Sequence, residues 1–215
     1  MNDHDTGTAP TPPLLPRGKR RLDGLEWEVR AVAFRRLYET GTPVPVAELE
    51  VTLGADPMAL AEAVESLERT GRLRRNDSGE IVTAGGISLE QTPHRIMTDR
   101  GARWTNCAYD ALGIVAATGQ GEVITTSPFS GVTIRIAFNG GKPEQSGAAL
   151  FLADVSCCDS FIDEWCPNVN LFEDLPSAER WARERELAGT VVSVDEGTEL
   201  AAGEWRPLVN ASSGS

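Results

Sequence analysis

Apolar side chains recur every three or four residues through the first third of the chain, which is the spacing of amphipathic helices. Gly41, Pro43 and Pro45 interrupt this pattern, and Asp56 is a good cap for a following helix that starts at Pro57. The predicted elements are helices over 25–41, 46–53 and 57–70 and a small hairpin across the polar turn 76–79. This order predicts a winged-helix-like N-terminal module over residues 23–84.

Alternation of apolar and polar positions dominates the rest of the chain and predicts strands with one buried face, as at Val132, Ile134 and Ile136. The predicted strands lie within 85–97 and over 122–126, 132–138, 148–155, 168–172 and 190–194. The predicted helices lie over 105–118, 159–164 and 177–187, the last capped by Ser177, with a short helical or irregular end over 195–206. We therefore predict an α+β fold, in which the module is followed by an α/β domain over residues 85–208 with a small mixed or antiparallel sheet.

The two ends of the chain show no such periodicity. Residues 1–22 combine prolines with a basic run, and residues 209–215 are mostly small and polar, so a disordered arm and a disordered tail are predicted. No run approaches the roughly 18 apolar residues of a membrane span, and the first residues lack the basic-then-apolar order of a signal peptide. We expect a cytoplasmic protein with no membrane contact. With 215 residues, 40% of them hydrophobic, the chain suits one domain of moderate size or two small ones, and we favour two.

The distribution of charge bears on nucleic-acid binding. Residues 107–215 hold 6 basic against 16 acidic side chains, which would repel a phosphate backbone. In the helix that would enter the major groove, Glu62, Glu65 and Glu68 oppose phosphate contact in the same way. The opposing feature is a set of arginines in the predicted hairpin, namely Arg72, Arg74 and Arg75. The pattern therefore disfavours DNA as a partner.

The candidate chemistry begins at Cys107 and Asp110, where a loop turns into a helix. Asn106 is the predicted N-cap, so Cys107 would be the first helical residue. There the positive end of the helix dipole would lower the pKa of the thiol. Asp110 follows three residues later and would share a helix face with the thiol. On its own the pair also fits a half-buried cysteine beside a capping aspartate.

Three further cysteines and one histidine complete the candidate ligands. In a chain without secretory features, Cys107, Cys157, Cys158 and Cys166 are expected to be reduced. The vicinal pair Cys157-Cys158 fits either an additional soft-metal or Hg(II) relay site or two buried cysteines at a strand end. For His94 a surface or capping role is favoured over a ligand role, because no second histidine lies near it in the sequence.

Several motifs together resemble the organomercurial (alkylmercury) lyases over about residues 25–200. They are Cys-Ala-Tyr-Asp-Ala-Leu from Cys107, the Ser130-Gly131 turn, and Cys166 in an apolar segment that leads to Pro-Ser-Ala-Glu-Arg-Trp at 176–181. The resemblance implies a domain of the alkylmercury lyase type. It also implies that Cys107 and Cys166 hold mercury, while Asp110 passes a proton from a thiol to the leaving carbon. The products would be a hydrocarbon and Hg(II), with no cofactor, and external thiols or a reductase would accept the Hg(II).

The chemistry of a carbon–mercury bond agrees with this reading. Thiolates are soft ligands that prefer soft metals, and an acid must protonate the carbon that leaves. A carboxyl group near two sulfurs and apolar walls is expected to favour its protonated form, because burial penalises the charged form. Two cysteines and Asp110 are thus sufficient groups for the reaction, with a small organomercury compound as substrate.

Three positions depart from the family pattern and leave alternatives open. Asn106 stands where an aromatic residue is common, Ser127 where some members have a further cysteine, and Pro167 where a second cysteine often follows the catalytic one. One alternative is a lyase-like scaffold that acts on a different carbon–metal or carbon–heteroatom bond. The other is a soft-metal binding or sensing protein without catalysis. The sequence leaves a monomer and a homodimer equally open.

Overall fold

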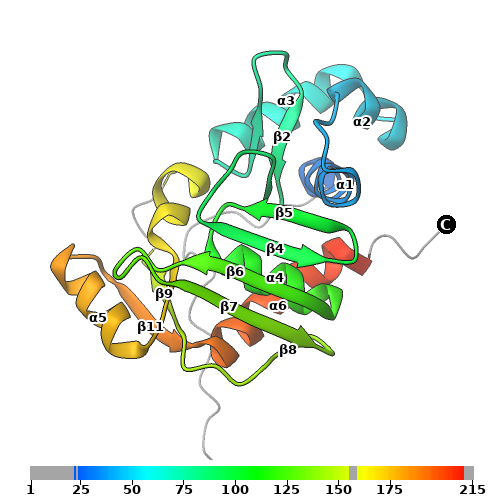
Figure 1. Ribbon diagram of the computed structural model, residues 1–215. Coiled ribbons are helices and arrows are strands. Elements are labelled where there is room, and N and C mark those ends of the chain that lie inside the picture. The colour runs from blue at the N-terminus through cyan, green and yellow to red at the C-terminus, as the bar shows by residue number, and fades with distance from the viewer. Residues whose placement is uncertain (1–21, 23, 155–158, 211–215) are drawn as a thin grey trace, which may run out of the picture.

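The computed structural model describes residues 22, 24–154 and 159–210 (Figure 1). Most of the predicted arm and tail lies outside the described residues, as do Cys157 and Cys158. Helices and strands are mixed along the chain, which confirms the predicted α+β class at that level. None of the helices in the described part of the chain combines the length and the apolar run that crossing a bilayer requires.

The described residues of the N-terminal module form the predicted helices and hairpin. The helices are α1 (Gly24–Thr40), α2 (Val46–Leu53) and α3 (Pro57–Arg69), and the hairpin strands are β1 (Leu73–Arg75) and β2 (Ile81–Ala84). Asp56 caps α3 as predicted, since its carboxylate accepts from the N–H groups of Met58 and Ala59 at 3.0 and 3.1 Å. Leu37, Leu49 and Leu67 are fully buried where the three helices meet.

The hairpin continues into an eight-stranded sheet with the order β1-β2-β3-β5-β4-β6-β7-β8. The added strands are β3 (Ile87–Ser88), β4 (His94–Thr98), β5 (Gly101–Thr105), β6 (Gln120–Thr126), β7 (Thr133–Asn139) and β8 (Lys142–Pro143). Strand β5 was not predicted. It pairs with β4 from Thr98↔Gly101 to His94↔Thr105, and every strand pairing among the described residues is antiparallel.

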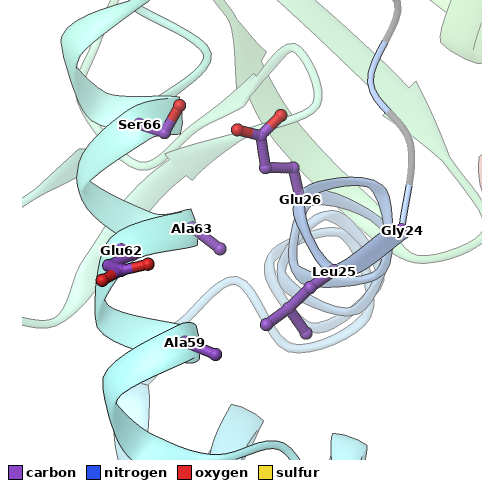
Figure 2. A pocket seen from close by; sticks show the side chains of 7 residues that line it. All are labelled: Gly24, Leu25, Glu26, Ala59, Glu62, Ala63 and Ser66. Carbon is purple, nitrogen blue, oxygen red and sulfur yellow. The ribbon is translucent and has the colours of Figure 1, made fainter.

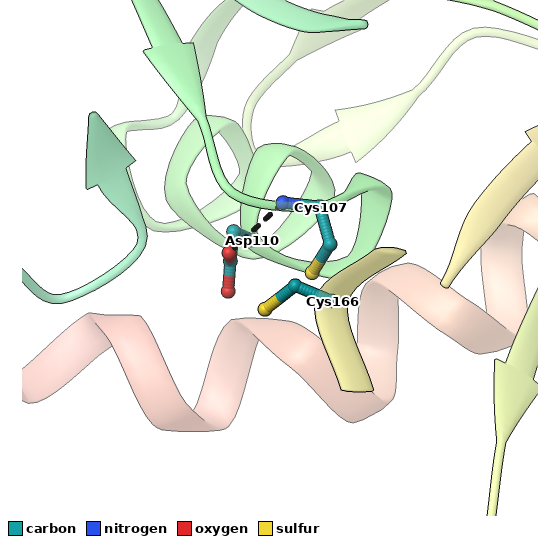
Figure 3. Close-up of side chains that lie close together, drawn as sticks. All are labelled: Cys107, Asp110 and Cys166. Atoms are coloured by element: carbon teal, nitrogen blue, oxygen red, sulfur yellow. Dashed lines mark hydrogen bonds between the residues drawn. The ribbon is translucent and has the colours of Figure 1, made fainter. Parts of the chain in front are cut away.

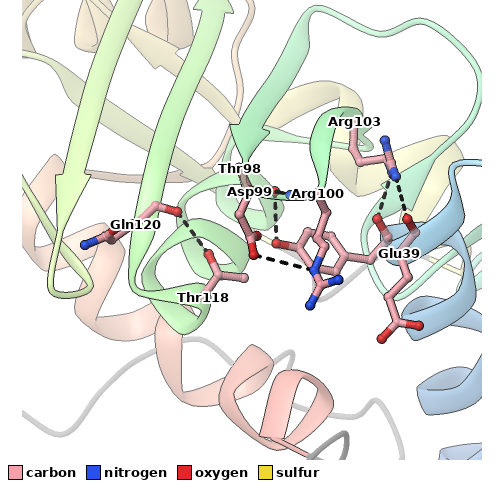
Figure 4. Close-up of polar contacts among 8 residues, drawn as sticks. Glu39, Thr98, Asp99, Arg100, Arg103, Thr118 and Gln120 are labelled. Carbon is pink, nitrogen blue, oxygen red and sulfur yellow. Dashed lines mark hydrogen bonds and ion pairs between the residues drawn. The ribbon is translucent and has the colours of Figure 1, made fainter.

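Arg103 on β5 fastens α1 to this sheet (Figure 4). Its Nε donates to the carbonyl oxygens of Leu37 and Tyr38 at 3.1 and 2.9 Å, and one terminal nitrogen donates to that of Glu39 at 3.1 Å. The last carbonyls of a helix have no partner within the helix, so a guanidinium group there satisfies several at once. The Tyr38 hydroxyl also donates to Thr98 at 3.0 Å.

Two helices, α4 (Ala108–Thr118) and α6 (Val194–Asn210), cover one face of the central strands (Figure 1). Residues 195–206, predicted as a short helical or irregular end, are helical but belong to a longer helix, because α6 has 17 residues. The two helices approach closely at Gly113, where an added Cβ would lie 2.3 Å from the Trp205 ring. The Trp205 indole N–H donates to the Gly85 carbonyl at 2.7 Å, which ties α6 to the turn before β3.

A second sheet of three strands stands beside the first, with the order β10-β9-β11. Its strands are β9 (Ala149–Ala153), β10 (Asn170–Phe172) and β11 (Gly189–Ser193), and α5 (Leu175–Glu184) packs on it through Trp181. The cap of α5 is Asp174, whose carboxylate accepts from Ser177 N–H at 2.8 Å, so the prediction of Ser177 as cap was wrong. Between β9 and β10 the chain forms a π-helix, η1 (Phe161–Trp165), and a 3-10 turn, η2 (Cys166–Asn168).

Candidate active site

The structure brings Cys107, Asp110 and Cys166 together at the start of α4 (Figure 3). Their two sulfurs and one carboxylate oxygen all lie within 4.8 Å of one another. The three residues are 0%, 6% and 4% exposed, so the cluster is almost shielded from water. Neither Cys107 nor Cys166 forms a disulfide. Two soft ligands and an acid therefore meet in one buried place, although Cys166 comes from the η2 turn far along the chain.

Local hydrogen bonds at the first turn of α4 determine where the Cys107 thiol and the Asp110 carboxyl lie. Cys107 itself is the N-cap, with extended backbone angles, so the prediction of Asn106 as cap was wrong. The Cys107 N–H donates to Asp110 Oδ2 at 3.2 Å, and the Asp110 N–H faces the Cys107 sulfur in the reciprocal half of a capping box. Asn106 instead donates its N–H to the Gly86 carbonyl at 2.9 Å. The helix start thus fixes the thiol and the carboxyl against each other.

The thiol of Cys107 does not have the lowered pKa that its helix position predicted. Burial raises the pKa well above its usual value, and the neighbouring Cys166 and the Asp110 carboxylate raise it further. The hydrogen bond from the Asp110 backbone acts in the opposite direction but is the weakest of these influences. Desolvation of the thiolate therefore outweighs the effect of the helix dipole on the pKa. The Cys107 thiol is protonated before a substrate binds.

Asp110 behaves as predicted for a buried acid. Burial raises the pKa of its carboxyl to about 7, against the opposing hydrogen bond from Cys107. Glu204 raises this pKa further and Arg30 lowers it; these two side chains form an ion pair of 3.1 Å between α6 and α1. A carboxyl with this pKa can hold and release a proton near neutral pH, which is the requirement for a general acid.

Cys166 is placed by bonds around the η2 turn. Its carbonyl accepts from Val169 N–H at 3.1 Å, and the Val169 carbonyl in turn accepts from Ala108 N–H at 3.2 Å. The first helical residue of α4 is therefore bonded directly to the turn that carries the second cysteine. The Asn170 side chain adds a bond of 2.9 Å to the Pro167 carbonyl. These contacts bring two distant segments of sequence into one site.

The alkylmercury lyase family matches residues 87–205, more than half of the chain and the part that holds all three groups. The chain belongs to the alkylmercury lyase family. Alkylmercury lyases of Staphylococcus epidermidis and Streptomyces lividans are 25% and 24% identical to it over 181 and 180 residues, each covering 82% of this chain and 80% of the relative. A solved structure, the mercury-bound form of MerB2, matches with a TM-score of 0.75 at 16% identity, over 86% of this chain and 96% of that one. At this level of identity, the match to MerB2 shows that the two proteins share a fold.

As a member of the alkylmercury lyases, the chain is a carbon–mercury lyase. The structure also shows contacts around the cluster that were not predicted from the sequence. An added Cβ at Gly86 would lie 2.9 Å from the Asp110 carboxyl carbon, so only a residue without a side chain lets β3 approach the acid. Tyr109 stacks edge-on against Trp165 and Trp205 at 5.8 and 5.5 Å. The Gly85-Gly86 pair was a visible signal of close approach, whereas nothing in the sequence pointed to the aromatic contacts.

His94 was wrongly predicted to have a surface or capping role. It lies on β4, 2% exposed, with Nδ1 2.7 Å from the Thr125 hydroxyl and a further bond to the Asn170 side chain. Burial lowers the pKa of the imidazole to about 4, so His94 is neutral near pH 7. Asn170 also donates to the Pro167 carbonyl, so His94 stabilises the turn that carries Cys166 through Asn170. His94 is not part of the cluster itself.

Ser127, which departs from the family pattern, has a local structural role. Its buried hydroxyl accepts from the N–H groups of Phe129 and Ser130 at 3.3 and 3.4 Å and so holds the turn between β6 and β7.

A surface hollow on the described part of the protein lies away from the cluster, between α1 and α3 (Figure 2). Leu25, Glu26, Ala59, Glu62 and Ser66 are among the residues that line it.

Proposed function

We propose that this chain is an organomercurial lyase in which Cys107 and Cys166 bind the mercury of the substrate and Asp110 protonates the leaving carbon. The observation that carries the proposal is the meeting of two reduced thiols and one carboxyl within 4.8 Å in a buried site. Two sulfurs at this separation can both reach one soft metal, because a typical metal–sulfur bond is about 2.3 Å long. Family membership supports the same reaction.

The proposed steps balance in atoms and charge. Mercury binds the Cys107 sulfur, whose proton leaves with the group that the substrate carried opposite the carbon. Cys166 then binds the same mercury and gives its proton to the Asp110 carboxylate. Asp110 delivers that proton to the carbon as the carbon–mercury bond breaks, and a hydrocarbon leaves. Mercury(II) remains on two thiolates until external thiols remove it. No electrons are gained or lost by the protein.

The raised pKa values fit this sequence of proton transfers. Burial raises the pKa of the Cys107 thiol, so this thiol stays protonated until mercury binds. A soft metal ion displaces a thiol proton because metal binding stabilises the thiolate. With a pKa of about 7, Asp110 can accept this proton and give it up again within one turnover.

The roles can be tested with phenylmercury, excess thiol and detection of benzene by gas chromatography. Cys107→Ala, Cys166→Ala and Asp110→Ala are each expected to lower turnover by at least about 100-fold, within the range typical for a positioned acid or nucleophile. Asp77→Asn, which changes an exposed carboxyl in the hairpin turn, is the control and should leave turnover unchanged. Turnover at the wild-type rate in any of the three variants would remove that residue from the mechanism.

Finer features of the protein belong to the same proposal. Residues 23–84 would be a winged-helix-like module with a structural role, and residues 85–208 the catalytic domain. The enzyme would need no resident cofactor, and external thiols or a reductase would receive the Hg(II). A site that depends on two reduced thiols suits a reducing compartment such as the cytoplasm.

The alternative of a DNA-binding metal sensor loses its main support. Arg74 forms an ion pair with Asp163. Arg75 pairs with Glu68 at 2.6 Å, and Arg72 lies over the Phe161 ring at 5.0 Å. The hairpin arginines that favoured phosphate binding therefore have partners within the chain. A gel-shift assay at low salt is expected to show no complex with duplex DNA.

A further inference from the structure

The π-helix η1, which ends directly before Cys166, docks on the end of α3 in the N-terminal module. The N–H groups of Phe161 and Ile162 donate to the carbonyl oxygens of Thr70 and Gly71 at 3.1 and 3.2 Å. The first N–H groups of one helix and the last carbonyls of another both lack partners within their own helices. These two helix ends satisfy each other, and the bond pair joins the module to the segment that carries the second thiol.

Gly71 makes this contact possible. An added Cβ there would lie 2.2 Å from Ser160 Oγ and 2.7 Å from the Phe161 nitrogen. The second atom belongs to the backbone, so a rotamer change of one side chain cannot relieve the clash. Any side chain at Gly71 would therefore push η1 away from α3. Gly71 also has a φ of +61°, which glycine adopts without strain.

Side chains strengthen the same contact and extend it towards α4. Asp163 accepts from the Ser160 hydroxyl at 2.5 Å and pairs with Arg74 of β1. Phe161, which lies under Arg72, packs edge-on against Trp165 at 5.8 Å, and Trp165 packs in the same way on Tyr109 of α4. A continuous row of contacts thus runs from the hairpin of the module to the helix that holds Cys107 and Asp110.

We propose that the N-terminal module clamps η1, and that Gly71 is a positioning residue which keeps the Cys166 sulfur opposite Cys107 and Asp110. Resting on the proposed function, this gives the module a task in catalysis. A second sulfur must sit within a few tenths of an ångström of its place to share one mercury with the first. Cys166 belongs to a turn and not to a strand, so it depends on the segments on either side for that accuracy.

The test compares Gly71→Ala with Gly54→Ala. Both glycines follow a helix of the module with left-handed φ, +61° and +58°, so both variants carry similar backbone strain. Only Gly71 has atoms in the way, since an added Cβ at Gly54 meets nothing within 4 Å. The matched pair therefore separates displacement of η1 from strain in the module.

The first measurement is the rate at which iodoacetamide alkylates each thiol, assigned by fragment-ion mass spectrometry. In Gly71→Ala we expect Cys166 to react at least about tenfold faster than in Gly54→Ala, while Cys107 keeps the wild-type rate. Cys107 reports global unfolding, because it is fully buried in α4. Equal Cys166 rates in the two variants, or parallel acceleration of both thiols, would overturn the clamp. This measurement needs no substrate, so it stands even if the wild-type protein cleaves no organomercury compound.

The second measurement is steady-state turnover of phenylmercury. Gly71→Ala is expected to lower kcat about tenfold or more at unchanged KM, because Cys107 still captures the substrate and only the second ligand is displaced. Arg74→Ala should show the same change in smaller degree, and Arg75→Ala, whose partner Glu68 lies within the module, should show none. The exchange of both charges in Arg74→Asp/Asp163→Arg should restore kcat. Loss of kcat in Arg75→Ala equal to that in Arg74→Ala would contradict the proposal.

Discussion

Asp110 has two roles at the start of α4, and both depend on its position three residues after Cys107. As the fourth residue of a capping box it accepts the Cys107 N–H, which settles the direction of the carboxyl. As a buried acid beside two sulfurs it has a raised pKa. A carboxylate that only caps a helix can lie at the surface, as Asp56 does at the start of α3. Burial is thus the feature that separates an acid catalyst from a cap.

The pH dependence of turnover should report this acid. In the proposed steps the Asp110 carboxylate must first accept the Cys166 proton, so with a pKa of about 7 for Asp110 we expect kcat to fall below pH 7 by up to about tenfold per pH unit and to level off above it. The measurement is kcat for phenylmercury between pH 5 and 9 at saturating thiol, with buffers that do not bind mercury. A rate independent of pH across this range would mean that proton transfer through Asp110 does not take place in the slow step.

At the scale of elements, the close approach of α4 and α6 helps to shield the site from water. This approach depends on one small residue, Gly113. Gly113 lies in the middle of α4, where the Trp205 ring and Ala201 fill the space that a side chain would need. Tyr109, one turn earlier, donates its hydroxyl to the Leu200 carbonyl at 3.1 Å. Close packing of this kind transmits a change on α6 to the residues at the start of α4.

Gly113→Ala is therefore expected to destabilise the protein by about 1–3 kcal/mol, the usual cost of overpacking. An added Cβ would lie 2.3 Å from the Trp205 ring, and the ring itself is held by its bond to Gly85. Gly203→Ala on α6 is the control, because an added Cβ there meets nothing within 4 Å; it should stabilise by about 0.5–1 kcal/mol. Urea unfolding of both variants measures the difference, and equal stabilities would disprove the steric account.

The elements that were predicted correctly are those whose pattern is local. The module helices and strands β6 and β7 follow from periodicity and from turn residues such as Asp56. Strand β5 was missed because Arg103-Trp104 shows no alternation, and Arg103 serves α1 and not the sheet. The full length of α6 was not predicted because Gly197, Gly203 and Pro207 interrupt its pattern. Gly197 nevertheless allows α6 to pack closely on Leu150.

The candidate site was predictable only in part. Spacing alone placed Asp110 on the same face as Cys107, since residues three apart are neighbours on a helix. Spacing could not place Cys166, which reaches the site through the pairing of β10 with β9 and the bond from Ala108 to Val169. The thiol pKa was predicted with the wrong sign because desolvation depends on tertiary packing, and the burial of His94 was missed for the same reason.

At the scale of the whole molecule, the buried side chains of Asp110 and His94, whose pKa values in the folded protein are about 7 and about 4, should oppose each other in the pH dependence of stability. Asp110 has a folded-state pKa of about 7, above that of an unfolded aspartate, so its contribution is present at low pH and is lost as the pH rises to 7. His94 has a folded-state pKa of about 4, below that of an unfolded histidine, so its contribution is present above pH 6.5 and is lost as the pH falls to 4.

Each change amounts to about 3–4 kcal/mol if the full difference in pKa is realised. Because the two slopes have opposite sign in the same window, the mercury-free protein is expected to keep a nearly constant free energy of unfolding between pH 4.5 and 6.5. Substitution of one member should reveal the other: Asp110→Asn should lose stability as the pH falls from 6.5, and His94→Gln should gain it. Urea unfolding of the three proteins at several pH values measures the slopes. Parallel curves for wild type and Asp110→Asn would show that the Asp110 carboxyl is not protonated near pH 6 in the folded enzyme, and its pKa would then be too low for the proposed transfer of the Cys166 proton.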